Sequence, residues 1–84
     1  MIKKDGAETK RERIAKMAQM IHAWLHQAKE QGLNYIPLKK TAAKLEFEFG
    51  LTKEKIMMYL EVIEQNDQIE IDAEIDQIRK LSVV

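Results

Sequence analysis

Lysines and threonines gather in two short stretches of this 84-residue chain, and they are the residues best suited to bind a ligand. Their ammonium and hydroxyl groups can donate hydrogen bonds to phosphate oxygens. The first stretch follows Pro37 and the second follows Gly50. The candidate phosphate contacts are Lys39, Lys40, Thr41, Lys44, Thr52, Lys53 and Lys55.

The residue types give less reason to expect a catalytic or metal site than a phosphate-binding one. The chain has no cysteine, so disulfide bonds and thiolate metal sites are excluded. His22 and His26 have a spacing that can chelate zinc, but no carboxylate is placed as a third ligand. The hydroxyl residues have no identifiable histidine and acid partners, and the glycines stand too far apart for a phosphate-binding loop. We therefore expect no enzyme activity, no metal and no cofactor.

Length and composition predict one small folded domain. The chain is 45% hydrophobic and 33% charged, which is typical of a folded protein. No apolar run approaches the ~18 residues that span a bilayer, and no apolar signal core follows the charged N-terminus. Because the absence of cysteine also suits a reducing compartment, we expect a cytoplasmic protein without a membrane segment.

A long first helix is predicted after a basic N-terminus. Residues 1–8 are expected to form a flexible basic arm, and residues 9–84 the domain. The helix begins at a capping box, either Asp5 with Glu8 or Thr9 with Glu12, and Gly32 ends it. Its apolar face consists of Ile14, Met17, Ala18, Ile21, Leu25 and Ala28.

Two further helices are predicted on either side of a tight turn. Residues 33–37 are expected to be short and extended, because Pro37 keeps the preceding residue out of the helical region. Pro37 opens the second helix, Gly50 ends it, and Thr52 caps the third. Gly50-Leu51-Thr52 thus forms the turn of a helix-turn-helix. The expected buried stripes are Leu38, Ala42, Leu45 and Phe49, then Ile56, Tyr59, Leu60 and Ile63.

The C-terminal segment allows two structures. Strict alternation over residues 68–72 predicts a strand, and residues 77–81 can return beside it after a turn at 73–76. That turn lacks glycine, asparagine and proline, and Ile75, Ile78 and Leu81 also fit a short helix. We favour the hairpin, which predicts a mainly helical fold of three helices with a C-terminal β-hairpin wing.

The chain resembles the winged-helix domains of bacterial, archaeal and viral transcription regulators. The resemblance covers roughly residues 10–81 and rests on Thr41-Ala42-Ala43-Lys44-Leu45, Phe49-Gly50-Leu51-Thr52, Ile56, Tyr59-Leu60, Ile63 and Ile69-Glu70-Ile71. It implies double-stranded DNA as the partner, with the third helix in the major groove and the wing against the backbone or minor groove. It also implies that Met58 and Gln65 reach bases and that Arg79 and Lys80 contact the DNA from the wing.

The charge distribution leaves a second hypothesis open. The net charge is zero, yet residues 1–50 carry a balance of +4 and residues 51–84 a balance of −4. Glu54, Glu61 and the nearby Glu64 would repel phosphates from the third helix. The alternative function is a protein-interaction module whose acidic third helix and wing dock a basic partner.

Self-association is the remaining expectation. The first helix carries more apolar surface than the ~100° stripe that one core requires. We therefore expect a homodimer through Met17, Met20, Trp24 and Ala28, although Trp24 can also pack over the core of its own chain. Phe47 points away from the second stripe and is either exposed or part of an interface. A dimer would set two recognition helices about 34 Å apart and favour a palindromic site.

Overall fold

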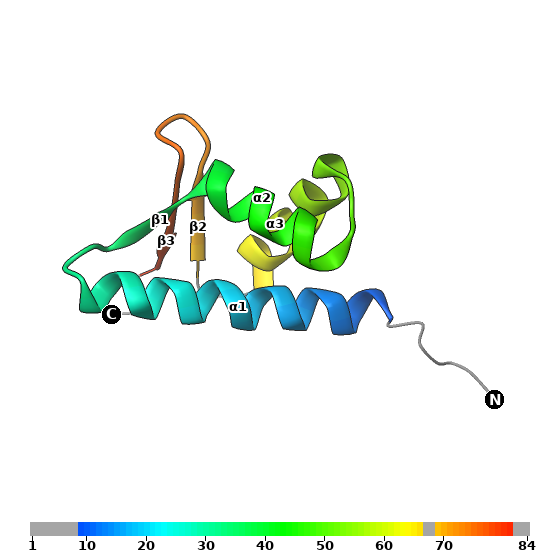
Figure 1. Cartoon of the computed structure of the whole chain (residues 1–84), viewed down its shortest axis with the longest axis horizontal. Helices are drawn as coiled ribbons and strands as arrows, with labels where there is room; N and C mark the ends of the chain where they lie inside the picture. The colour runs from blue at the N-terminus through cyan, green and yellow to red at the C-terminus, as the bar shows by residue number, and fades with distance from the viewer. Residues whose placement is uncertain (1–8, 67–68, 82–84) are drawn as a thin grey trace.

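Three helices and a three-stranded antiparallel sheet form the chain in a computed structural model that describes residues 9–66 and 69–81 (Figure 1). The predicted arm at residues 1–8 and the alternative cap of Asp5 with Glu8 lie outside the described residues. The predicted fold class is confirmed, and the order of elements is compatible with a winged-helix layout. The elements are α1 (Lys10–Glu30), β1 (Tyr35–Pro37), α2 (Leu38–Phe49), α3 (Lys53–Asn66), β2 (Ile69–Asp72) and β3 (Gln77–Lys80).

Local hydrogen bonds set both ends of α1 as predicted. The Glu12 N–H donates to Thr9 Oγ1 at 3.2 Å, and the Thr9 N–H donates to Glu12 Oε1 at 2.9 Å. The bond from the Thr9 N–H, and after it one that the Thr9 hydroxyl donates to Glu12 Oε1 at 3.0 Å, hold the pKa of the Glu12 carboxyl below its ordinary value of 4.5. Gly32 takes a left-handed conformation with φ of 85° after the last turn, and its N–H donates to the Lys29 carbonyl.

The helix-turn-helix between α2 and α3 is also confirmed. Gly50 is left-handed with φ of 65°, and its N–H donates to the Glu46 carbonyl at 2.8 Å. Thr52 then caps α3, because its hydroxyl oxygen accepts a hydrogen bond from the Lys55 N–H at 3.2 Å. Leu51 packs against the core between the two helices. The turn therefore fixes the angle at which α3 leaves α2.

One hydrophobic core joins all six elements. Figure 1 shows α1 running along one side, with the sheet and the other two helices facing it. Its fully buried large side chains are Met17, Ile21, Leu45, Ile56, Leu60, Ile63, Ile69 and Ile78. The predicted stripes are confirmed, except that Ile14 and Phe49 are only half-buried at the margin of the core. Within the described part of the chain, no helix combines the length and apolar character needed to cross a bilayer.

The C-terminal segment forms a hairpin, so the alternative of a short helix is wrong. Strands β2 and β3 are joined by a turn at residues 73–76. The sheet order is β1-β3-β2, with Ile78 of β3 between Ile36 and Ile71 in register. The sequence predicted an extended segment before Pro37 but not its pairing with β3. This pairing joins the wing to the segment that leads directly into α2.

Asp76 explains how the wing turn forms without glycine. It is the only non-glycine residue with positive φ (56°) among those described, and aspartate tolerates this conformation better than most residues. Its Oδ1 accepts a hydrogen bond from the Lys39 N–H at 2.8 Å, and its carbonyl accepts one from the Leu38 N–H at 3.1 Å. Pro37, at the N-cap position, offers no side-chain oxygen of its own. The wing turn therefore caps α2 from 37 residues away.

We expect Asp76→Ala to lower the free energy of unfolding by about 1–2 kcal/mol, because it removes the helix cap and strains the left-handed position. Asp76→Asn should retain most of the stability, since its amide oxygen accepts the same bond and asparagine tolerates positive φ. Urea denaturation followed by circular dichroism measures both. Glu74→Ala, an exposed position in the same turn, is the control. Equal midpoints for Asp76→Ala and Glu74→Ala would contradict the assigned cap.

Candidate functional site

The outward face of α3 gathers most of the residues that the sequence predicted for this helix. Its buried face is formed by Ile56, Tyr59, Leu60 and Ile63, and its opposite face is exposed. Thr52 lies at the start of the helix, and the exposed residues of α3 are Lys53, Glu54, Lys55, Met58, Glu61, Gln65 and Asn66. Met58 has 53% of its surface exposed, which is unusual for a large apolar side chain without a partner.

Glu64 does not join the acidic residues on this face. Its Oε2 accepts a hydrogen bond of 2.8 Å from the Ile71 N–H, and both residues are half-buried. Since β2 is an edge strand, the carboxylate covers a backbone donor that no neighbouring strand occupies. The outward face of α3 therefore presents two carboxylates, Glu54 and Glu61, rather than three.

The predicted contacts on α2 divide into surface and core. Thr41 is only 3% exposed and lies in the core, so its hydroxyl does not reach a phosphate. Lys39 and Lys40 are exposed at the end of α2 that adjoins the wing. Lys44 Nζ lies 5.1 Å from the centre of the Trp24 ring, a cation–π contact between α2 and α1.

The wing is more acidic in effect than its sequence suggests. Arg79 Nη2 lies 3.1 Å from Glu70 Oε1 and 3.6 Å from Asp72 Oδ2, and Nη1 donates to Gln77 Oε1 at 2.8 Å. The guanidinium is therefore shared among neighbours on the outer face of the sheet. Lys80 is exposed. Against these two cations, residues 69–80 carry Glu70, Asp72, Glu74 and Asp76.

A second group of cations lies at the opposite end of the molecule. The start of α1 and the turn between α2 and α3 lie at the same end, away from the wing (Figure 1). Lys10 Nζ is 5.9 Å from the centre of the Tyr59 ring, which brings the start of α1 against α3. Lys53 and Lys55 follow the turn at this end. The basic residues in the first half of α1 are Lys10, Arg11, Arg13 and Lys16.

The predicted dimer patch on α1 is divided between core and surface. Met17 is fully buried and Ala28 is 8% exposed, so both belong to the core of their own chain. Met20 and Trp24 are half-buried and pack at its margin. A stripe on a helix shows which residues share a face, but it does not show how far the face is covered. Only Met20 and Trp24 remain accessible to a partner.

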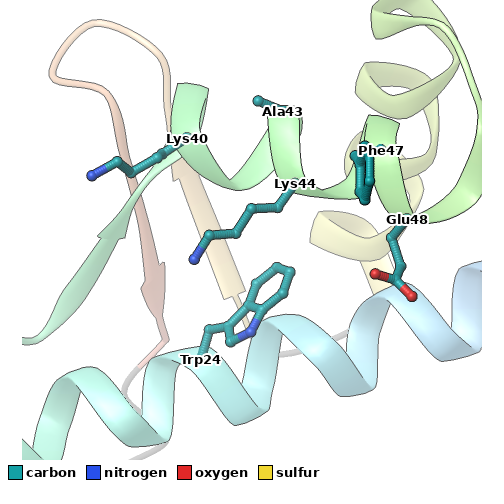
Figure 2. A pocket seen from close by; sticks show the side chains of 6 residues that line it. All are labelled: Trp24, Lys40, Ala43, Lys44, Phe47 and Glu48. Carbon is teal, nitrogen blue, oxygen red and sulfur yellow. The ribbon is translucent and has the colours of Figure 1, made fainter.

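Sequence reasoning missed a shallow groove between α1 and α2. Figure 2 shows Lys44 reaching from α2 across the indole of Trp24, with Phe47 farther along α2. The groove has a volume of about 420 Å³ and is lined by Trp24, Lys40, Ala43, Lys44, Phe47 and Glu48. Phe47 is 90% exposed. The sequence marked Phe47 as an outlier, but the groove depends on the packing of two separate helices.

The two histidines remain on the surface of α1. His26 Nε2 lies 3.6 Å from Glu30 Oε2, one turn away. No three metal-ligating side chains come together within residues 9–66 and 69–81. Neither histidine contributes to the α3 face.

We expect Glu64→Ala to lower the free energy of unfolding by about 1 kcal/mol, because the Ile71 N–H loses a charged acceptor. Glu61→Ala, at an exposed position one turn earlier, should change stability by less than about 0.5 kcal/mol. Urea denaturation compares the two variants, and amide hydrogen exchange of Ile71 should accelerate only in Glu64→Ala. Unchanged exchange at Ile71 would show that the carboxylate does not hold this strand edge.

Known proteins offer no guide to the site. No protein-family model, no curated protein and no solved structure matches this chain. Its compatibility with a winged-helix layout therefore rests on the order of its helices and strands and on the helix-turn-helix geometry. What the α3 face binds has to follow from the side chains that it presents.

Proposed function

We propose that this protein is a DNA-binding winged-helix protein that acts as a homodimeric transcription regulator. The observation that carries the proposal is the outward face of α3, the second helix of a helix-turn-helix. This face is exposed along its length, its first turn carries Lys53 and Lys55, and Glu64 is turned away from it. An exposed helix of this kind fits the width of the major groove of duplex DNA.

Each part of the face has a role that its chemistry supports. Lys53 and Lys55 place cations at a helix N-terminus, where the helix dipole also favours an anion, so they contact phosphates. Met58 offers an apolar contact for a thymine methyl group. Gln65 offers an amide for the paired donor and acceptor of adenine. The basic first half of α1 adds sequence-independent attraction at the same end of the molecule.

Most of the affinity for DNA then comes from phosphate contacts of α3 and α1, and the wing contributes little. Arg79 is shared with Glu70 and Asp72, and Asp76 already caps α2 at Lys39. The wing therefore offers Lys80 as its exposed cation. Because phosphate contacts release counterions, binding should weaken steeply as the salt concentration rises.

Removing two phosphate contacts tests the proposal. We expect Lys53→Ala with Lys55→Ala to weaken binding to a random-sequence duplex about tenfold and to reduce the salt slope by about 1.8. Fluorescence anisotropy between about 50 and about 200 mM salt gives both values. Lys29→Ala, an exposed lysine at the far end of α1, is the matched control and should bind as the unchanged protein does. If the unchanged protein binds no duplex at the lower salt concentration, the proposal fails.

The acidic wing favours a second candidate function, the docking of a basic protein segment. In that case Glu54 and Glu61 of α3 would join the carboxylates of the wing in one binding surface. These carboxylates would then attract the basic segment, whereas they would repel DNA phosphates.

Glu54→Gln with Glu61→Gln separates the two functions by the sign of the effect. If α3 faces phosphates, we expect the double variant to bind duplex DNA about three to ten times more tightly, because two repulsive charges are gone. If α3 docks a basic segment, the same variant should bind a fluorescent oligolysine peptide more weakly. Anisotropy titrations with both probes measure this. Unchanged affinity for DNA would place these carboxylates outside the DNA interface.

A further inference from the structure

Helix α2 carries a second stripe opposite the one that enters the core. The first stripe, Leu38, Thr41, Ala42 and Leu45, is buried. The second stripe has the same helical spacing of three and four residues and lines the groove beside α1. It consists of Lys40, Ala43, Lys44, Phe47 and Glu48.

The exposure of Phe47 is the feature that this stripe leaves unexplained. The other exposed large apolar residues among those described, such as Met58 at 53% and Ile75 at 55%, keep close to half of their surface covered. Only a tenth of the Phe47 surface is covered. A polar residue at this position of the helix would leave the core unchanged. Next to it, Trp24 forms an apolar floor for the groove (Figure 2). An aromatic side chain and an apolar hollow therefore lie side by side on one surface.

We propose that this groove is the docking site for a second copy of the chain, with the two α2 helices antiparallel across a two-fold axis. Such an interface uses the same patch on both copies, so the patch must be complementary to itself. Antiparallel pairing sets Phe47 of one copy over the small Ala43 of the other. In that register Lys40 of one copy lies two residues, about 3 Å along the helix axis, from the level of Glu48 of the other, an offset that their long side chains can span.

Charge supports this occupant over an unrelated partner. Lys40 and Glu48 lie at opposite ends of the stripe, so antiparallel helices bring opposite charges together twice. Lys44, near the middle, has its Nζ 5.1 Å from the centre of the Trp24 ring of its own chain. The dipoles of two antiparallel helices also oppose each other favourably. A purely basic partner would pair only with Glu48, and a purely acidic partner only with Lys40.

The size of a stable dimer interface sets how much surface this face has to supply. Stable interfaces bury roughly 600–1,000 Å² of each partner. The lower value is about a tenth of the 5982 Å² surface of this chain. The 12-residue α2 is about 18 Å long, and the flank of α1 with Met20 and Trp24 widens its face. The groove lies between α1 and α2 and leaves the outward face of α3 uncovered. The inference rests on the proposed function only in assuming a homodimer. It moves the dimer interface from Met17 and Ala28, which are buried, to the second stripe of α2.

Sedimentation equilibrium of the whole chain without DNA, from about 1 µM to about 1 mM, tests the inference. We expect a monomer–dimer equilibrium within this range. Phe47→Ser should raise its dissociation constant by about 100-fold or more, since each dimer loses two central aromatic contacts. Because Phe47 is 90% exposed, the variant should keep its circular dichroism spectrum and urea midpoint. Ile75→Ser, an exposed apolar position in the wing turn outside both proposed interfaces, is the control and should dimerise normally.

Charge reversal tests the antiparallel register. Lys40→Glu and Glu48→Lys should each weaken the dimer about tenfold, and the two together should restore it to within about threefold. If the double variant stays as weak as the single variants, the antiparallel pairing is overturned.

Two results overturn the docking site itself: a monomer throughout the concentration range, or a dimer that Phe47→Ser leaves intact. The DNA titration of the same proteins keeps the two proposals apart. A monomer that binds duplex DNA removes the dimer and leaves DNA binding in place. A dimer sensitive to Phe47→Ser that binds no duplex at low salt keeps this interface and removes the proposed function.

Discussion

The contact between the wing turn and the start of α2 is the constraint on which the arrangement of the molecule depends. Asp76 closes the first turn of α2 with its carboxylate and its carbonyl, at the point where the chain leaves β1. Since β3 begins directly after Asp76, the same contact holds β1 and β3 in register. The direction of α2 sets the direction of α3 through the turn at Gly50. One aspartate thereby couples the sheet to the helix that presents the candidate interface.

Several charged groups are engaged within the fold, and this determines what remains for a partner. Glu64 covers a strand edge, Arg79 is shared among its neighbours, and Lys44 rests on Trp24. Each of these side chains has a charge that a count along the sequence would assign to the surface. Apart from these, exposed cations lie at the α3 start and along the first half of α1, and also at Lys29, Lys39, Lys40 and Lys80. The packing of the chain therefore decides which of its charged side chains stay available at the surface.

Local chemistry made the helix ends predictable. Thr9, Gly32, Gly50 and Thr52 act on backbone groups within a few residues of themselves, so the sequence alone locates them. The Asp76 cap, the Glu64 bond to Ile71 and the pairing of β1 with β3 could not be predicted, because each joins segments whose approach depends on the packed core. The burial of Thr41 has the same origin. Its residue type suited a phosphate contact, and only the packing decided that its side chain met the core rather than the solvent.

Each edge of the small sheet lacks a free backbone donor at one position. At one edge β1 is three residues long and ends in Pro37, which has no N–H to donate. At the other edge the Ile71 N–H of β2 is already occupied by Glu64. An extended segment from another chain would therefore meet an interrupted ladder at either edge. The sheet works as an internal brace between the wing and the start of α2.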